Sequence, residues 1–276
     1  MKRQAFLNRH HDGPMIRMPN AWDKGSAKIM VDAGAEALGT TSAGILYAQG
    51  LPDYEGALSR DECLRYAEDM CSAVDVPISI DSEDGYGDTP EHVAKTFRMM
   101  IQVGAMGGSI EDHPRVAGRD LLSAEETAER VRAAREAIDV SGVPFVLTAR
   151  AECFLVGHPD RLNESIRRIQ MYEAAGAHCV YVPGLRNRED IQAVLDAVSC
   201  PINVLIGIKT FDLPLSELEN MGVRRVSTGG SVACAALGLI RSAVNGLHGE
   251  DLSYRDQMIT HDELTTLFGD GPAAGI

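Results

Sequence analysis

The sequence predicts an α/β protein of the (β/α)8 TIM-barrel class, in which eight parallel strands close into a ring and each is followed by a helix. Its 276 residues suit one barrel. Short apolar runs alternate with amphipathic helical stretches from end to end, and the strands are entered by two alternating kinds of turn. A doubly wound sheet is the alternative. It would more usually show a glycine-rich fingerprint after the first strand, where this chain has Pro19-Asn20-Ala21-Trp22.

Eight apolar runs read as strands, and seven helical stretches lie between them. An eighth helix follows the last strand. We expect residues 1–248 to form a single barrel domain with a short N-terminal extension, and 249–276 to form a C-terminal extension. The predicted strands are 15–19, 37–41, 77–81, 106–111, 145–150, 178–182, 202–205 and 224–227, and the predicted helices are 23–33, 59–74, 90–103, 123–139, 161–175, 188–198, 214–221 and 231–247.

The residues that precede the strands support this count. Glycine just after a helix ends it in the left-handed conformation, and proline is tolerated at the first residue of a strand. The two alternate strictly along the chain, so that odd strands follow a proline and even strands a glycine. The prolines are 14, 77, 144 and 201, and the glycines are 34, 104, 176 and 222.

Composition excludes several classes of partner. The net charge of −14 and the pI of about 5.0 argue against nucleic acid and anionic membrane surfaces. The six cysteines form no C-x-x-C pair, which leaves neither a common zinc spacing nor a disulfide framework. The N-terminus lacks an apolar signal core, and no run approaches the about 18 apolar residues of a membrane span. A reducing cytoplasm is therefore the expected location.

Carboxylates gather at the ends of two neighbouring predicted strands. Asp81 and Glu83 follow the third strand, and alternation would point them to one side. Glu111 or Asp112 would reach the same mouth from the fourth strand. A divalent cation would relieve the repulsion between them, so we predict an oxygen-ligand site for Mg²⁺, with Mn²⁺ as a substitute. The structural alternative is that Asp81, Asp84 and Asp88 cap the next helix.

Other candidates lie at the ends of further strands. Arg150 ends the fifth strand and could clamp a carboxylate or phosphate, or pair with Glu111 or Glu83. Ser42-Ala43-Gly44 after the second strand could bind an anion through backbone N–H groups or could be a plain loop. The glycines at 229–230 after the eighth strand could hold phosphate or only form a tight turn.

The polar segment 113–122 follows a presumed metal ligand and reads as a lid over the substrate. Its chemical candidates are His113, Arg115 and Arg119. His113 could equally be a surface histidine. Trp22, the only tryptophan, is a candidate wall of the substrate site.

At this point the chain resembles the isocitrate lyase / phosphoenolpyruvate mutase superfamily over residues 14–247. The resemblance is carried by Asp81-Ser82-Glu83-Asp84-Gly85-Tyr86-Gly87, Ile110-Glu111-Asp112 and Thr148-Ala149-Arg150-Ala151-Glu152, with support from Pro19-Asn20-Ala21 and Leu51-Pro52-Asp53.

The resemblance implies a Mg²⁺ enzyme that binds a small 2-oxo or 2-hydroxy carboxylate and works through an enolate or a similar oxyanion. It makes Asp81 the direct metal ligand, with Asp53, Glu83 and Glu111 holding metal-bound waters. Ser42, Ala43, Gly44 and Arg150 would bind the substrate carboxylate. It also implies dimers or tetramers that exchange the last helix, 231–247.

Three departures from the family narrow the activity. Glu83 stands where the commonest motif has aspartate. The lid lacks the Lys-Lys-Cys-Gly-His sequence of isocitrate and methylisocitrate lyases, and no cysteine lies in 112–122. Tyr181-Val182-Pro183-Gly184 ends strand six where phosphonate-cleaving members carry histidine, and the lid lacks their asparagine.

We therefore expect a Mg²⁺-dependent lyase or decarboxylase that cleaves a C–C bond of a small dicarboxylate. Arg150, Glu111, His113 and Arg119 are the catalytic candidates. Phosphorus–carbon chemistry and a non-catalytic barrel that binds an oxo-acid remain the alternatives.

Overall fold

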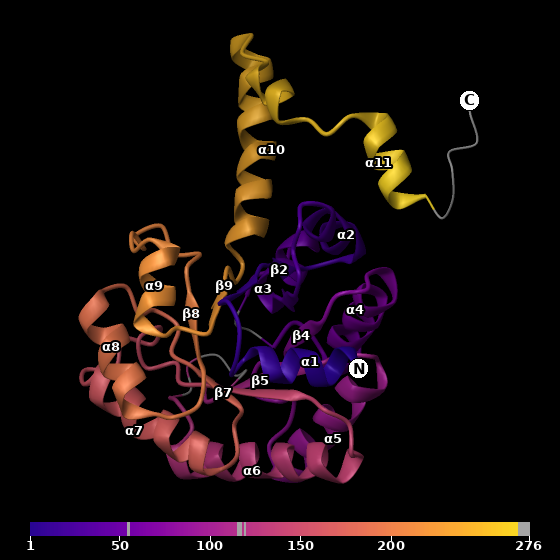
Figure 1. Cartoon of the computed structure of the whole chain (residues 1–276). Coiled ribbons are helices and arrows are strands. Elements are labelled where there is room, and N and C mark those ends of the chain that lie inside the picture. Colours follow the sequence, from indigo (N-terminus) through magenta and orange to yellow (C-terminus); the bar gives the residue numbers. More distant parts are fainter. Residues whose placement is uncertain (54–55, 115–117, 119, 270–276) are drawn as a thin grey trace.

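The computed structural model describes residues 1–53, 56–114, 118 and 120–269 of the chain, which fold as an α/β barrel (Figure 1). Nine strands are assigned in this part of the chain, and all of their pairings are parallel. They are β1 (Ile16–Met18), β2 (Asn20–Ala21), β3 (Leu38–Thr40), β4 (Ile78–Asp81), β5 (Gly107–Glu111), β6 (Val146–Arg150), β7 (Cys179–Tyr181), β8 (Ile202–Leu205) and β9 (Arg225–Ser227).

The sheet closes on itself through its first strand. β1 pairs with β9 and β2 pairs with β3, while Pro19 alone separates β1 from β2. The predicted first strand is thus one segment that runs on to Ala21 and is interrupted at Pro19, because proline has no N–H to donate to a ladder. The prediction of eight barrel strands in this order is confirmed.

In the described part of the chain, seven helices alternate with the strands around the outside of the barrel (Figure 1). Their positions agree with the predicted helices to within a few residues. They are α2 (Lys24–Asp32), α4 (Arg60–Ala73), α5 (Pro90–Gln102), α6 (Ala124–Ser141), α7 (Arg161–Ala174), α8 (Arg188–Ala197) and α9 (Leu215–Met221).

Local signals in the sequence fix the ends of these helices. Both serine capping boxes form, Ser59 with Glu62 and Ser123 with Glu126. The four glycines that precede the even strands all have φ between +95° and +102°, the left-handed conformation that only glycine adopts readily. Thr89 caps α5, so the cap alternative does not explain the acids before it.

Among the residues that the structure describes, four helical segments lie outside the repeating pattern, and sequence reasoning assigned none of them. They are α1 (Lys2–Arg9), α3 (Ser42–Ala48), the 3-10 turn η1 (Ser253–Gln257) and α11 (His261–Phe268). α1 places Phe6 in a buried cluster with Ile16, Val146 and Cys179, which lie at the N-terminal ends of their strands. The first helix therefore seals the end of the barrel opposite to the carboxyl ends of the strands.

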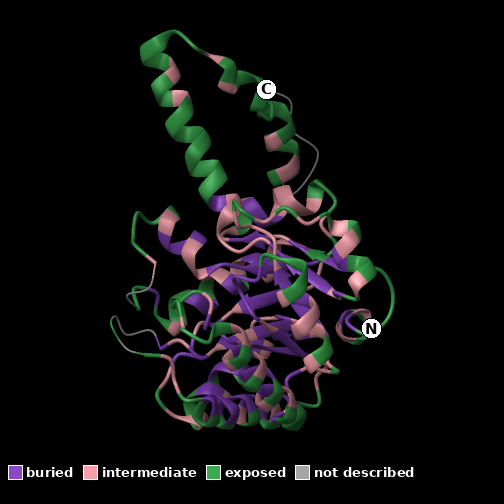
Figure 2. Ribbon diagram, turned by 90° about the vertical axis from the view of Figure 1, so that its left-hand side faces the viewer, coloured by how far each residue is buried: buried purple, intermediate pink, exposed green. Residues whose placement is uncertain are grey.

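The eighth predicted helix forms but does not cover the barrel. α10 (Ser231–Gly249) projects away from the strands (Figure 1) and is exposed along most of its length (Figure 2). It contacts α3 and η1, and α11 then packs on α2. None of the helices in the described ranges is long and apolar enough to cross a membrane.

Candidate active site

A cavity of about 430 Å³ opens at the carboxyl ends of the barrel strands. This is the end at which barrel enzymes carry their active sites. Alternate residues of two neighbouring strands line it, Ser79 and Asp81 of β4 and Ser109 and Glu111 of β5, together with Arg150 of β6. Asp81, Glu111 and Arg150 therefore lie together at one rim of the barrel.

Arg150 holds three carboxylates together at this rim. Its Nη1 lies 2.9 Å from Asp81 Oδ1 and 2.9 Å from Glu111 Oε2. Its Nε donates to Glu152 Oε1, also at 2.9 Å. The four side chains are between 4% and 17% exposed, so the cluster is largely shielded from solvent. The single positive charge of Arg150 therefore faces three carboxyl groups, so the cluster has more acidic than basic groups.

Two of these carboxyl groups, those of Glu111 and Glu152, have raised pKa values. Burial raises the pKa of Glu111 well above the ordinary glutamate value, and neighbouring carboxylates raise it further against the opposing effect of Arg150. Burial likewise raises the pKa of Glu152 to about 7. A cation bound among these acids would favour their ionised forms, which is the electrostatic condition for a metal site.

A tight turn after β4 carries Glu83 into the cavity lining. Glu83 has φ +47° and Tyr86 has φ +59°, so both lie in the left-handed region that is costly for residues other than glycine. Hydrogen bonds hold the turn, since Asp84 Oδ1 accepts from Tyr86 N at 3.0 Å, and Arg130 donates to Gly87 O at 3.0 Å. A turn, rather than continued strand alternation, thus places Glu83 beside Asp81.

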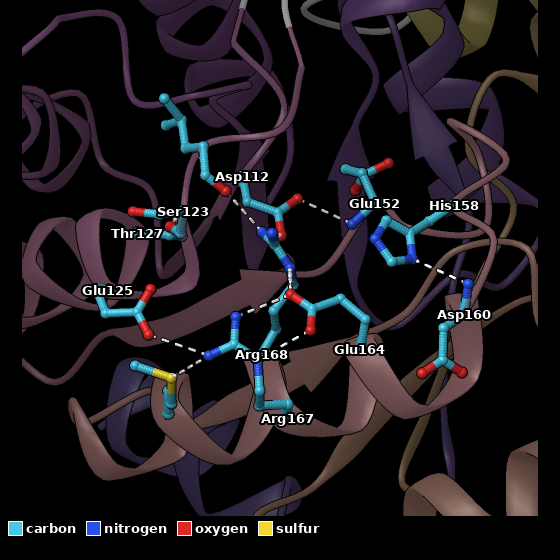
Figure 3. A network of polar contacts seen from close by, with 12 residues as sticks. Asp112, Ser123, Glu125, Thr127, Glu152, His158, Asp160, Glu164, Arg167 and Arg168 are labelled. Carbon is cyan, nitrogen blue, oxygen red and sulfur yellow. Dashed lines mark hydrogen bonds and ion pairs between the residues drawn. The ribbon is translucent and has the colours of Figure 1, made fainter.

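Asp112 is not among the residues that line the cavity, and its contacts hold the walls of the cavity together (Figure 3). It is fully buried, and its Oδ2 accepts from Arg168 Nη1 at 2.8 Å and from the Tyr172 hydroxyl at 2.8 Å. Its Oδ1 accepts from the backbone N–H of Glu152 at 2.9 Å, and its carbonyl oxygen accepts from Leu122 N at 2.9 Å. Asp112 is therefore a structural residue that fixes Glu152 and the base of segment 113–122, and Glu111 alone of the pair faces the cavity.

The predicted anion site at 42–44 is the first turn of α3, with Thr41 as its N-cap. Ser42 donates to Asp81 Oδ2 through both its backbone N–H, at 3.3 Å, and its hydroxyl, at 3.1 Å. The Gly44 N–H donates to Thr41 Oγ1. These N–H groups already have partners, so a substrate carboxylate would have to compete with Asp81 for Ser42.

The other predicted site residues divide into three groups. Asp53, His113, Ser42 and Ala43 line the cavity. Gly44 and Trp22 do not: a Cβ at Gly44 would lie 3.0 Å from Trp22 Cβ, and Trp22 packs on the core. The role of Trp22 as a wall of the substrate site stays a prediction, and the described contacts of its side chain are with the core. Arg119 and Arg115 lie outside the described residues.

Two charged residues of the cavity lining were missed from the sequence, Glu152 and Arg225. Arg225 of β9 is 2% exposed and crosses the barrel interior. It donates to Asn203 Oδ1 at 3.0 Å and to Thr148 Oγ1 at 3.0 Å, and its Nη1 lies 3.1 Å from His10 Nε2. Arg225 lies two residues before Ser227, which also lines the cavity. Strand alternation places both side chains on the same side and could have revealed Arg225.

Comparison with known proteins gives a family for this arrangement. The family model described as phosphoenolpyruvate phosphomutase matches residues 6–248, which include every element of the barrel. The chain belongs to the phosphoenolpyruvate phosphomutase family. Members of this family with named activities include both lyases and mutases.

Three family members illustrate the range of similarity. A solved structure from Burkholderia cenocepacia J2315, of a protein named as a lyase/mutase, superposes with a TM-score of 0.91 at 37% identity, over 98% of this chain and 96% of that chain. An uncharacterised protein of Mycobacterium tuberculosis is 30% identical over 82% of this chain and 81% of its own length. The 2-methylisocitrate lyase of Halalkalibacterium halodurans is 26% identical over 77% of this chain and 70% of its own length.

Proposed function

We propose that this family member is a Mg²⁺-dependent enzyme that cleaves a C–C bond of a small 2-oxo or 2-hydroxy dicarboxylate. The observation that carries the proposal is the cluster of three carboxylates on the single guanidinium of Arg150, at the open end of the barrel. Such an excess of negative charge is costly unless a cation shares the site.

The donor set fits Mg²⁺ rather than a metal held by protein ligands alone. Within residues 1–53, 56–114, 118 and 120–269, no group of three or more His, Cys, Asp or Glu side chains is arranged to hold a metal directly. Mg²⁺ usually keeps several waters and binds proteins through one or two carboxylates. Asp81 would be the direct ligand, with Glu83, Glu111 and Asp53 bonded to its waters. Mn²⁺ would fit the same oxygen donors.

The charged groups at this end of the barrel support C–C bond cleavage. When bound there, Mg²⁺ would act as a Lewis acid that stabilises negative charge developing on the substrate oxygen. Arg150 would bind and orient a substrate carboxylate with its planar fork, and Ser42 would keep Asp81 in place through two hydrogen bonds.

Cleavage leaves the bonding electron pair on carbon, and that carbon must take up a proton. The candidate donors that line the cavity are Glu111, which burial favours in the protonated form, and His113. Arg119, the remaining catalytic candidate, would act from segment 113–122.

A screen of small 2-oxo and 2-hydroxy dicarboxylates with Mg²⁺ tests the proposal, with pyruvate or glyoxylate formation as the readout. Turnover should require Mg²⁺ and should be lost in Asp81→Ala. Full turnover by that variant, or by metal-stripped protein, would contradict the scheme. Thermal stabilisation by these acids without turnover would instead indicate a non-catalytic barrel.

Phosphorus–carbon chemistry is the second candidate, favoured by the description of the family model and by a solved structure named as a phosphonomutase, which is 36% identical over 88% of this chain. The sequence Tyr181-Val182-Pro183-Gly184, which begins at the last residue of β7 and lacks histidine, counts against it. Phosphate release, or a new ³¹P signal from phosphonopyruvate, would decide in its favour.

We also propose that two copies of the chain exchange α10. A groove of about 610 Å³ runs over the outer surface of β1 between α2 and α9, where an eighth helix of a barrel would pack. Met15, Met30 and Val232 line it. The stripe Leu237, Ile240, Val244 and Leu247 recurs at helical spacing on α10 and is exposed. A second copy's α10 would cover both surfaces, as a dimer or within a tetramer.

A further inference from the structure

The cavity has two chemically different halves, which follow from the order of the strands around the barrel. Three of its acidic groups, Asp81, Glu83 and Glu111, come from the side of β3 to β5, and a fourth, Glu152, follows β6 and pairs with Arg150. The side that follows β6, β7 and β8 supplies Leu155, Val156, Pro183 and Leu205. Arg150 and Tyr181 stand between the halves, with the guanidinium carbon 5.2 Å from the centre of the tyrosine ring.

Two of the apolar side chains are unusually exposed for their position. Leu155 is 47% and Val156 is 45% exposed, although both lie only a few residues after Arg150. Single exposed apolar residues are normal on protein surfaces. Here, however, two adjacent ones line the cavity that also contains the charged cluster, so that anything bound at the cluster lies beside them.

The turn that carries these residues is fixed to the barrel. The N–H groups of Leu155 and Val156 both donate to Glu152 O, at 2.9 and 3.1 Å, and His158 N donates to Cys153 O at 2.9 Å. Phe154, which precedes Leu155, packs on the core, and the guanidinium carbon of Arg161 lies 5.0 Å from the centre of its ring. The apolar side chains are thus held at the cavity rather than carried on a mobile tip.

The loop after β7 completes the wall. A Cβ at Gly184, which has φ +99°, would lie 3.5 Å from Leu155 Cδ2, so Leu155 packs directly over the Pro183-Gly184 turn. On the next strand, Leu205 Cδ1 would be 3.1 Å from a Cβ at Gly229. Among the described residues that line the cavity from β7 and β8, which are Tyr181, Pro183, Asn203 and Leu205, none is charged.

We propose that Leu155, Val156, Pro183 and Leu205, here called the apolar wall, bind an alkyl substituent larger than methyl on the substrate. This inference rests on the proposed function and adds its substrate class, a 2-hydroxy or 2-oxo diacid that bears an apolar chain. A polycarboxylate with a third charged group would place that charge against the wall without a partner, and the wall would reject it.

The test measures dissociation constants by calorimetry, in the presence of Mg²⁺, for malate and for malates with methyl, ethyl, propyl and butyl groups on carbon 3. Each methylene buried on the wall should tighten binding by about fourfold or less, and methyl to butyl by about tenfold or more. In the double variant Leu155→Ser/Val156→Ser the whole series should span less than about twofold. Val140→Ser, an exposed valine at the far end of α6, is the matched control and should keep the wild-type slope.

The outcomes separate this inference from the function on which it rests. A steep slope without turnover of any acid would support the wall and contradict the lyase. Turnover with a flat slope would support the lyase and overturn the wall. A slope retained in the double variant, or no measurable binding of any acid, would also overturn it. So would a change in mass of the double variant by light scattering with the slope unchanged, because the two residues would then contact another copy of the chain.

Discussion

Glu111 and Arg150 are direct neighbours in the register of β5 and β6, and their side chains meet at 2.9 Å between Oε2 and Nη1. The same Nη1 also reaches Asp81 on β4. The barrel therefore places the carboxyl groups of Asp81 and Glu111 and the guanidinium of Arg150 on three successive strands. Four of the five predictions below depend on this contact or on the acids around it.

Asp81→Asn should lower kcat/KM for the diacid substrate by at least about 10²-fold, because it removes the charge that would bind the cation directly. The assay is steady-state turnover with saturating Mg²⁺. Asp75→Asn is the control, since that side chain is fully exposed and forms an ion pair with the exposed Lys2. Equal activity of the Asp81 variant and wild type would remove the basis for the metal site.

Arg150→Met should lower the free energy of unfolding at pH 7, without metal, by about 3–5 kcal/mol, because it leaves buried carboxylates without their partner. Chemical denaturation measures this loss, and part of it should return when Mg²⁺ is added. Arg188→Met breaks an exposed pair with Glu217 and should cost less than about 1 kcal/mol. If Arg150→Met lowered the free energy of unfolding no more than Arg188→Met does, the three acids would not depend on Arg150 for their stabilisation.

Mg²⁺ should raise the melting temperature of the wild-type protein, since it binds only the folded rim. At about 100 times its Kd the stabilisation should approach about 2.7 kcal/mol. Differential scanning calorimetry with and without EDTA measures the effect, and Asp81→Ala should show none. A similar rise with Na⁺ at equal ionic strength would point to screening rather than to a site.

The pH dependence of stability should reveal the proton on Glu152. Because burial raises its pKa from 4.5 to about 7, the folded state keeps a proton that the unfolded chain loses above about pH 4.5. The contribution of this group to stability therefore falls as the pH rises through 4.5 to 7. Glu152→Gln cannot lose a proton, so its stability relative to wild type should rise by about 1–3 kcal/mol between pH 5 and 8.

Denaturation at several pH values checks this difference. Glu129→Gln, on the exposed side of α6, is the matched substitution and should give a constant offset from wild type. A constant offset for Glu152→Gln as well would show that Glu152 is ionised across the range. Mg²⁺ should reduce the effect, because a cation near the rim favours the carboxylate.

Ile240→Glu/Val244→Glu should convert the proposed oligomer to monomer, because it places two charges in the apolar stripe of α10. Light scattering after size exclusion gives the mass directly. Ser242→Glu lies on the opposite face of the same helix and should leave the mass unchanged. A wild-type chain that is monomeric at micromolar concentration would contradict the exchange of α10.

The sequence by itself determined the barrel, the order of its strands and most of the rim. Proline and glycine act locally on the backbone, so their alternation gave the eight strand entries, and the two capping boxes gave helix starts. Strand alternation is equally local. It predicted one side for Asp81 and Glu83, while Glu111 or Asp112 and Arg150 were candidates because they end neighbouring strands.

Only the tertiary structure decided how these groups pair. Which of Glu111 and Asp112 faces the cavity depends on Arg168 and Tyr172, which are 56 and 60 residues from Asp112 in the chain. The same holds for the engagement of Ser42 by Asp81, for the position of Arg225 within the barrel and for the departure of α10. Each depends on contacts between distant segments, and the free energy of such contacts is set by burial and charge in the folded molecule, which no local pattern contains.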